Sequence, residues 1–180
     1  MGELKIGRMV LGSCATNTYF LYREGENKAV VVDPADQGTK VYASLFKNDL
    51  KVEGILLTHG HFDHIWGLEA LKGAVNRERK EKGLEPIKVY ALDAERELLG
   101  NADMNVSEMA GRACTVSADE YLKDGQEITI AGNQVIINAH FEESARFNKM
   151  LVENGIWVSA LELKSDGVEQ YYMQAMGDMR

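Results

Sequence analysis

Cysteine and proline are scarce in this chain, with two of each among 180 residues. Cys14 and Cys114 lie far apart and suggest no disulfide framework, so we expect a protein of the reducing cytoplasm. No run approaches the ~20 apolar residues of a membrane span. The N-terminus lacks the charged, apolar and small-residue regions of a signal peptide. These absences favour a globular cytoplasmic protein that does not enter a membrane.

Basic residues are in the minority, with 20 Lys and Arg against 28 Asp and Glu and a formal net charge of -8. Binding to a nucleic-acid backbone calls for a basic face, so nucleic acid is not an expected partner. Hydrophobic residues make up 45% of the chain and charged residues 27%, which is ordinary for a globular protein. A chain of this length can bury a substantial core.

Histidine is also scarce, yet three of the four histidines fall within six consecutive positions. The stretch consists of Thr58, His59, Gly60, His61, Phe62, Asp63 and His64. Residues 54–58 form a short apolar segment that predicts a buried strand, and apolar residues at helical spacing follow the stretch. Imidazole nitrogens and carboxylate oxygens are common ligands of zinc and similar divalent ions. The loop therefore favours a metal site over the alternative, a polar loop with solvated histidines.

This loop resembles the H-x-H-x-D-H signature of the metallo-β-lactamase superfamily, in particular the group similar to hydroxyacylglutathione hydrolase (glyoxalase II). Residues 17–21 resemble the early strand of that family, residues 29–34 its strand ending in Asp-Pro, and residues 122–125 the turn before its late hairpin. The likeness covers roughly residues 5–140. It implies an α/β fold, a metallo-β-lactamase-like αββα sandwich that is incomplete in its second half.

The resemblance also assigns roles within the loop. His59 and His61 would point to one centre and, with a later histidine, hold one divalent ion. Asp63 and His64 would help to hold a second ion at a neighbouring centre, and Asp63 would also orient the nucleophile as the catalytic residue. Zinc is the expected ion, with iron or manganese as alternatives.

Two further residues are expected to support the loop from outside the ion's own ligands. Asp33 follows the strand of residues 29–32, and in the family this aspartate supports the metal loop rather than binding the ion. The alternative for Asp33 is a simple turn residue at the end of a strand. Thr58, at the start of the loop, is the second expected supporting residue.

The chain departs from the family pattern after residue 138. The family has a turn similar to Pro-Gly-His-Thr-x-Gly-Ser, whose proline and glycines are missing here. His140 stands at about the position of the third ligand, and the alternative is a histidine on the surface or at a helix start. No histidine follows His140, so the second ion lacks its usual ligands. The pair of Gly177 and Asp178 lies too far along the chain to replace the bridging aspartate.

We therefore divide the chain into a metallo-β-lactamase-like domain over residues 1–143 and an atypical α-β-α tail over residues 144–180. We expect this tail to pack on the second half of the fold or to replace it. Helices are predicted over residues 146–154 and 168–176, and a strand over residues 156–163. Residues 144–177 are weakly similar to the C-terminal end of ABC-transporter ATPase subunits, but no Walker A sequence is present and no nucleotide chemistry follows.

Elsewhere the patterns predict strands over residues 6–11, 18–22, 29–32 and 87–91, and a hairpin over residues 127–131 and 134–138 around Gly132 and Asn133. Helices are expected over residues 37–47, from the metal loop to Leu71, and over residues 94–99 with Asp93 as N-cap and Gly100 as stop. The charged run of residues 74–83 predicts a solvated helix face. Residues 101–117 are either a substrate-facing loop or an ordinary packed loop.

The predicted function is that of a metal-dependent hydrolase, in which a metal-activated water attacks an acyl ester or a thioester such as a hydroxyacylglutathione. Its partner would be a small-molecule substrate, and association into a homo-oligomer is left open as an alternative to a monomer. The alternative is a catalytically inactive scaffold or binding protein with a degenerate, incomplete metal site.

Overall fold

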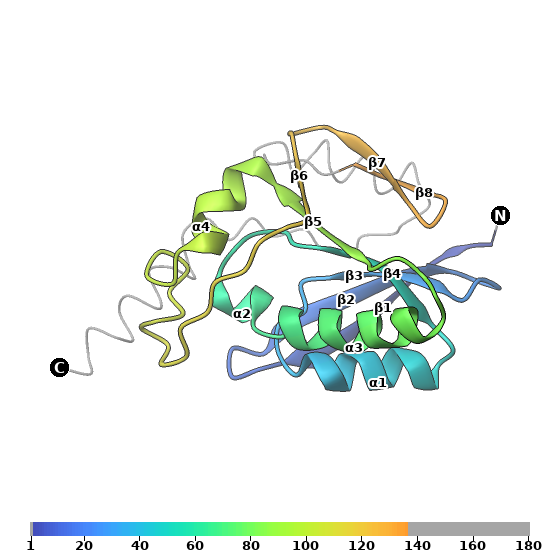
Figure 1. Cartoon of the computed structure of the whole chain (residues 1–180), viewed down its shortest axis with the longest axis horizontal. Helices are drawn as coiled ribbons and strands as arrows, with labels where there is room; N and C mark the ends of the chain where they lie inside the picture. Colours follow the sequence, from blue (N-terminus) through green and yellow to red (C-terminus); the bar gives the residue numbers. More distant parts are fainter. Residues whose placement is uncertain (1, 137–180) are drawn as a thin grey trace, which may run out of the picture. The chain divides into compact units, whose positions relative to one another are not determined.

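A six-stranded sheet forms the centre of residues 2–136, the part of the chain that the structure, a computed structural model, describes (Figure 1). Its strands, in spatial order, are β1 (Leu4–Leu11), β2 (Thr16–Arg23), β3 (Lys28–Val32), β4 (Lys51–Leu56), β5 (Lys88–Leu92) and β6 (Glu120–Leu122). β1 to β3 pair antiparallel, and β3 to β6 pair parallel. Parallel neighbours end at the same edge of a sheet, so the loops that follow β3, β4 and β5 meet there.

Two long helices, α1 (Gly38–Lys47) and α3 (Leu68–Glu81), cover one face of this sheet. The short helix α2 (Phe62–Ile65) follows β4, and the 3₁₀ helix η1 (Asp93–Glu95) and α4 (Arg96–Gly100) follow β5. α1 and α3 lie side by side beneath the strands (Figure 1). Their apolar faces are buried on the sheet through Val41, Leu45, Leu68, Leu71 and Val75. The charged run of residues 74–83 lies mostly in α3 and is only partly the solvated face that the sequence predicts. Glu78 and Arg79 are half-buried, since Tyr42 donates to Glu78 and Arg79 pairs with Glu53.

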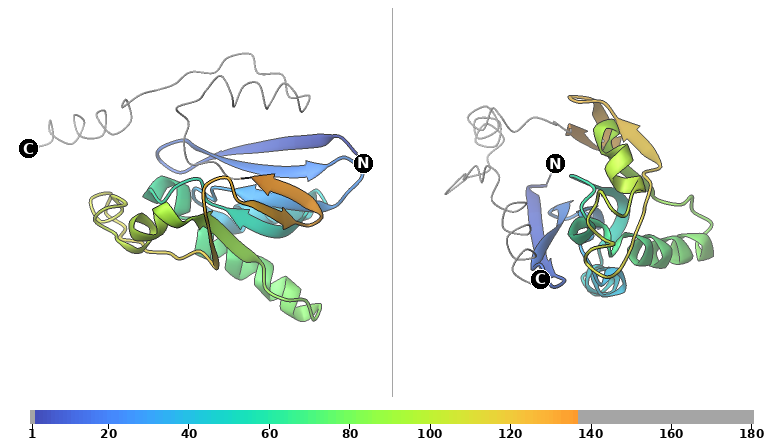
Figure 2. Two further views of the ribbon diagram at one scale, coloured as in Figure 1. Left: turned by 90° about the horizontal axis from the view of Figure 1, so that it is seen from above. Right: turned by 90° about the vertical axis from the view of Figure 1, so that its left-hand side faces the viewer.

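The opposite face of the sheet packs against a hairpin made of β7 (Glu127–Ile130) and β8 (Asn133–Ile136). Val30, Leu56, Tyr90 and Leu122 alternate along their strands with the residues that face the helices, and Ile130 of the hairpin packs on them. Figure 2 shows the hairpin and the two long helices on opposite sides of the sheet. The described layers are helix, sheet and second sheet, which are the first three layers of the αββα sandwich expected from the sequence.

Most predicted elements agree with the structure to within a few residues. The strands expected over residues 6–11, 18–22, 29–32 and 87–91 are β1, β2, β3 and β5. The strand expected over residues 54–58 is β4, which begins and ends earlier. The single helix expected to run from the metal loop to Leu71 is divided into α2 and α3 at Trp66 and Gly67, where Gly67 N–H donates to Pro34 O (2.8 Å).

Two local predictions were wrong. Asp93 does not cap a helix, since its carboxylate accepts hydrogen bonds from the guanidinium of Arg96 (2.8 and 3.0 Å), and the segment divides into η1 and α4. The hairpin turns at Ala131 and Gly132 rather than at residues 132–133, with φ angles of 53° and 83° that are typical of a type I′ turn. β6 was not predicted, because three residues are too short to show a period.

The longest helix within residues 2–136 is α3 with 14 residues, so no described helix could cross a bilayer. The expected domain boundary at residue 143, the helices and strand of the tail, and the ABC-transporter likeness of residues 144–177 all fall outside the described residues. They remain predictions.

Candidate metal centre

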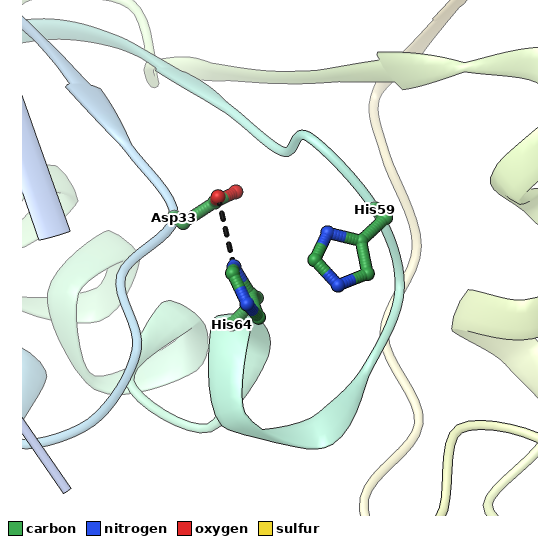
Figure 3. A group of neighbouring side chains, drawn as sticks. All are labelled: Asp33, His59 and His64. Atoms are coloured by element: carbon green, nitrogen blue, oxygen red, sulfur yellow. Dashed lines mark hydrogen bonds and ion pairs between the residues drawn. The ribbon is translucent and has the colours of Figure 1, made fainter. Parts of the chain in front are cut away.

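The loop between β4 and α2 carries the clustered histidines. Leu57 continues from β4 with its N–H donated to Tyr90 O (2.9 Å), and the chain then leaves the sheet. His61 is extended (φ -63°, ψ 146°) and starts α2, a single turn that contains Asp63 and His64. The short turn brings His64 back toward the end of β3, so the loop closes on Asp33 (Figure 3).

Asp33 is the buried centre of this arrangement, with 4% of its surface exposed. Its carboxylate accepts three hydrogen bonds, from Thr58 N–H (2.8 Å), from Thr58 Oγ1–H (2.5 Å) and from His64 Nδ1 (2.9 Å). The backbone of Asp33 is fixed as well, because its N–H donates to Leu56 O (3.0 Å) and its C=O accepts the hydroxyl of Thr18 (2.7 Å). The neighbouring strands β3 and β4 thus place a carboxylate and two of its donors at one edge of the sheet.

These hydrogen bonds determine which nitrogen of each imidazole is left to bind an ion. His64 donates Nδ1–H to Asp33, so its Nε2 carries the lone pair when the ring is neutral. Thr58 has one hydroxyl proton, which it donates to Asp33, and its oxygen therefore accepts Nδ1–H of His59 (3.0 Å). Asp33 thus orients His64 directly and His59 through Thr58. An imidazole held in this way by a carboxylate is the usual supporting arrangement around a bound metal ion.

The two imidazoles differ in their affinity for protons. Burial, followed by the positive charge of His64, lowers the pKa of His59 to about 4. Burial would also lower the pKa of His64, but the hydrogen bond to Asp33 and the charges of Asp33 and Asp63 outweigh it and raise that pKa. His59 is therefore a neutral imidazole at pH 7, which is the form that binds a metal ion.

The structure brings most of the predicted ligands into one corner. The ring centroid of His59 lies 4.0 Å from that of His64 and 4.9 Å from that of His61. Asp63 Oδ2 lies 3.6 Å from His64 Nε2. Ligand atoms of Asp33, His59 and His64 all lie within 4.8 Å of one another. Figure 3 shows these three side chains gathered at the loop. Of this group, His59 belongs to the first centre that the sequence suggests and His64 to the second. Asp33 was expected to support the loop from outside the ligands.

The remaining predicted ligand, His140, lies outside the described residues, so its role as third ligand stays a prediction. Cys14 and Cys114 form no disulfide and are partly exposed, and neither belongs to the cluster of Asp33, His59 and His64. Burial raises the pKa of the Cys114 thiol, which makes it less reactive.

Two residues that the sequence did not single out hold the metal loop from outside. Thr16, at the start of β2, donates its hydroxyl proton to Asp63 Oδ2 (2.6 Å). Glu95, in η1, accepts the N–H of Gly60 on Oε2 (3.0 Å). These pairs are 47 and 35 residues apart in the chain, so no local pattern could have revealed them.

Residues 101–117 form a turn-rich loop that packs against the start of α2. Asn105 and Ser107 are fully buried in it, and Asn105 Nδ2–H donates to Cys114 O (2.8 Å). The C=O of Asn105 accepts the N–H of Phe62 (3.0 Å), so this loop also positions the metal loop. Polar side chains buried in this way are well paired, which explains an ordered segment without helical or strand periodicity.

Comparison with known proteins agrees with this geometry. Residues 11–79, which include Asp33 and the whole metal loop, match the family model described as "Metallo-beta-lactamase superfamily". The crystal structure of BLEG-1 B3 metallo-beta-lactamase superimposes with a TM-score of 0.63 at 30% identity, covering 73% of this chain and 59% of that one. Residues 11–79 thus match the metallo-β-lactamase superfamily, and the described part of the chain has the mixed α/β fold of that superfamily.

Two curated relatives that match part of this chain have names that state a hydrolase. The "Probable metallo-hydrolase YqgX" of Bacillus subtilis (strain 168) is 32% identical over 123 residues, which are 68% of this chain and 53% of the relative. The "Hydroxyacylglutathione hydrolase cytoplasmic" of Arabidopsis thaliana is 32% identical over 113 residues, 61% of this chain and 43% of the relative. The chain thus spans about half the length of the curated relatives that it matches. Neither relative supports the ABC-transporter likeness of the tail.

Proposed function

We propose that this chain is a metal-dependent hydrolase that acts on an acyl ester or a thioester. The observation that carries the proposal is the cluster of Asp33, His59 and His64, whose possible ligand atoms lie within 4.8 Å of one another. The hydrogen bonds of Asp33 and Thr58 would leave Nε2 of each imidazole available to an ion. Two relatives whose names state a hydrolase activity support the class of reaction.

The donor atoms fit a divalent ion of the zinc type. Neutral imidazole nitrogens and a carboxylate oxygen suit zinc well and also suit iron or manganese, so zinc is the first choice. His59 and His61 would hold one ion together with His140, and Asp63 and His64 would help to hold a second. Asp33 and Thr58 would orient the imidazoles rather than bind an ion themselves, since their polar atoms already have partners.

A divalent ion bound here would lower the pKa of a bound water towards ~7 and polarise the carbonyl of the substrate. The chain's own contribution is to place a proton acceptor beside that water. Asp63 has this role in the proposal, because Thr16 donates to its Oδ2 and so fixes the direction of the other oxygen. That second oxygen, Oδ1, would accept the proton of the attacking water.

The substrate class rests on the relative from Arabidopsis thaliana, whose name specifies hydroxyacylglutathione. A thioester of this kind is a small molecule, and the carbon of its acyl carbonyl is the atom that the water would attack. The same name supports a cytoplasmic location, in agreement with the scarcity of cysteine.

Elemental analysis of protein purified without chelator tests this proposal, together with an assay on a model thioester. We expect about one or more divalent ions per chain and measurable thioester hydrolysis, both lost in His61→Ala. Glu97→Ala, an exposed residue of α4, is the control and should change neither. His140→Ala tests the third ligand and should weaken the binding of the ion.

A second candidate is an inactive scaffold with an incomplete metal site, favoured by the presence of only one histidine outside the metal loop. Folded protein that contains no ion and hydrolyses no thioester would support this candidate and contradict the hydrolase. Protein that holds the ion but lacks turnover would restrict the function to metal binding.

A further inference from the structure

Gly60 stands between His59 and His61 and is buried against the segment that follows β5. A Cβ atom at this position would lie 2.9 Å from Leu99 N and 3.1 Å from Leu98 Cγ. Such distances leave no room for a side chain, so the backbone of the metal loop touches α4 directly at this residue. The loops after β4 and β5 meet there because these strands are parallel neighbours.

A buried backbone N–H needs an acceptor, and the N–H of Gly60 finds it in a side chain. Glu95, in η1, accepts this N–H on Oε2 at 3.0 Å. The Glu95 side chain is partly buried, whereas its neighbour Glu97 is exposed. Because Gly60 is buried, its N–H would have little access to water if this acceptor were removed.

We propose that Glu95 is a positioning residue that sets the affinity of the metal loop for its ion. This inference rests on the proposed metal-binding function. Glu95 acts through Gly60, and Gly60 separates the two imidazoles that alternate toward the ion, so a shift at Gly60 moves both. A loop that visits other conformations binds its ion more weakly in proportion to the time it spends away from the competent one.

Three variants of the full chain test this role. Zn²⁺ affinity is measured by competition with a chromophoric chelator for Glu95→Ala, Glu95→Gln and Glu97→Ala. Glu95→Ala should weaken Zn²⁺ binding roughly 10- to 100-fold, as is common for residues that support metal ligands. Glu95→Gln keeps an oxygen that accepts the N–H and should stay close to wild type. Glu97→Ala removes the same charge from the same segment and should have no effect.

Two results would overturn the proposal. If Glu95→Ala binds Zn²⁺ as tightly as Glu97→Ala does, Glu95 has no positioning role. If Glu95→Gln is as weak as Glu95→Ala, the effect comes from the negative charge and not from the hydrogen bond to Gly60.

A measurement without metal separates this inference from the proposed function. Amide hydrogen exchange of Gly60 is followed by NMR in the chelator-treated chain, where we expect protection in wild type, in Glu95→Gln and in Glu97→Ala. Protection should be lost in Glu95→Ala. Wild-type protein that binds no Zn²⁺ but shows this pattern would contradict the proposed function and keep the contact, whereas an unprotected Gly60 in wild type would contradict the contact itself.

Discussion

Asp33 connects the end of β3 to both ends of the metal loop. Its buried carboxylate receives two donors from Thr58, which precedes the histidines, and one from His64, which ends the cluster. Burying a carboxylate is costly unless donors surround it, and these three donors meet that need. The same three contacts fix the rings that would face an ion. A single residue thus links the stability of this edge to its chemistry.

Thr58 gives a test of this link at the scale of one residue. Thr58→Val keeps the shape of the side chain but removes the hydroxyl that accepts Nδ1–H of His59, so Zn²⁺ affinity should fall roughly 10- to 100-fold. Thr58→Ser restores the hydroxyl and should restore the affinity. In the chelator-treated protein, ¹⁵N NMR should show His59 protonated at Nδ1 in wild type and in Thr58→Ser. An unchanged tautomer in Thr58→Val would contradict the relay from Asp33 through Thr58.

At the scale of elements, the packing of α1 on α3 brings the metal loop to its place. α3 starts directly after α2, and α1 starts soon after Asp33, so the two helices hold both sides of the site. They approach closely at Gly38, where a Cβ would meet backbone atoms of Gly67 and Leu71. Backbone atoms cannot move aside as the tip of a flexible side chain can.

Gly38→Ala should therefore destabilise the protein by about 1–3 kcal/mol, since one helix must shift to admit the methyl group. Gly73→Ala in α3 is the matched control, because no atom lies within 4 Å of a Cβ at that exposed position. That control should be stabilising by about 0.5–1 kcal/mol, because alanine favours a helix over glycine. Urea unfolding curves measure both. Equal effects of the two substitutions would contradict the close approach of the helices.

At the scale of the whole molecule, the described part of the chain is helices, a six-stranded sheet and a hairpin that packs on the far face of that sheet. The site lies at the edge where β3, β4 and β5 end, so the folding equilibrium of this unit and the protonation of the site are coupled.

The metal-free chain should lose stability as the pH falls from about 6.5 toward 4. In that window the unfolded chain takes up a proton on His59, while the folded chain, whose His59 has a pKa of about 4, does not. The loss should be on the order of 2 kcal/mol by about pH 5. His64 does not contribute there, because its folded pKa is raised and its stabilisation is lost only as the pH rises above 6.5. Urea unfolding in chelator measures the profile.

His59→Gln removes the titrating group and should flatten the profile between pH 6.5 and 5. A variant as acid-sensitive as wild type would show that His59 is not buried in a neutral form. Because a bound ion would compete with protons for the same nitrogen, the measurement is made without metal.

Sequence and structure agree best where a feature is local. The clustered histidines and the apolar segment before them lie next to one another in the chain, and so do the valines of β3. The apolar segment before the histidines and the helical spacing of apolar residues after them therefore predicted a loop between a strand and a helix at the right residues. β6 was not predicted because Glu120–Leu122 becomes a strand only through its pairing with β5.

The sequence by itself indicated the likeness to the superfamily, the order of most strands and helices, and the donor atoms available to an ion. The tertiary structure decided which of those atoms meet, because Asp33, Thr16 and Glu95 reach the metal loop from distant parts of the chain. The amino-acid type of each residue fixes which ligand atoms it can offer. Their tautomers and directions follow from long-range hydrogen bonds, which exist only after parallel strands have brought their ends to one edge.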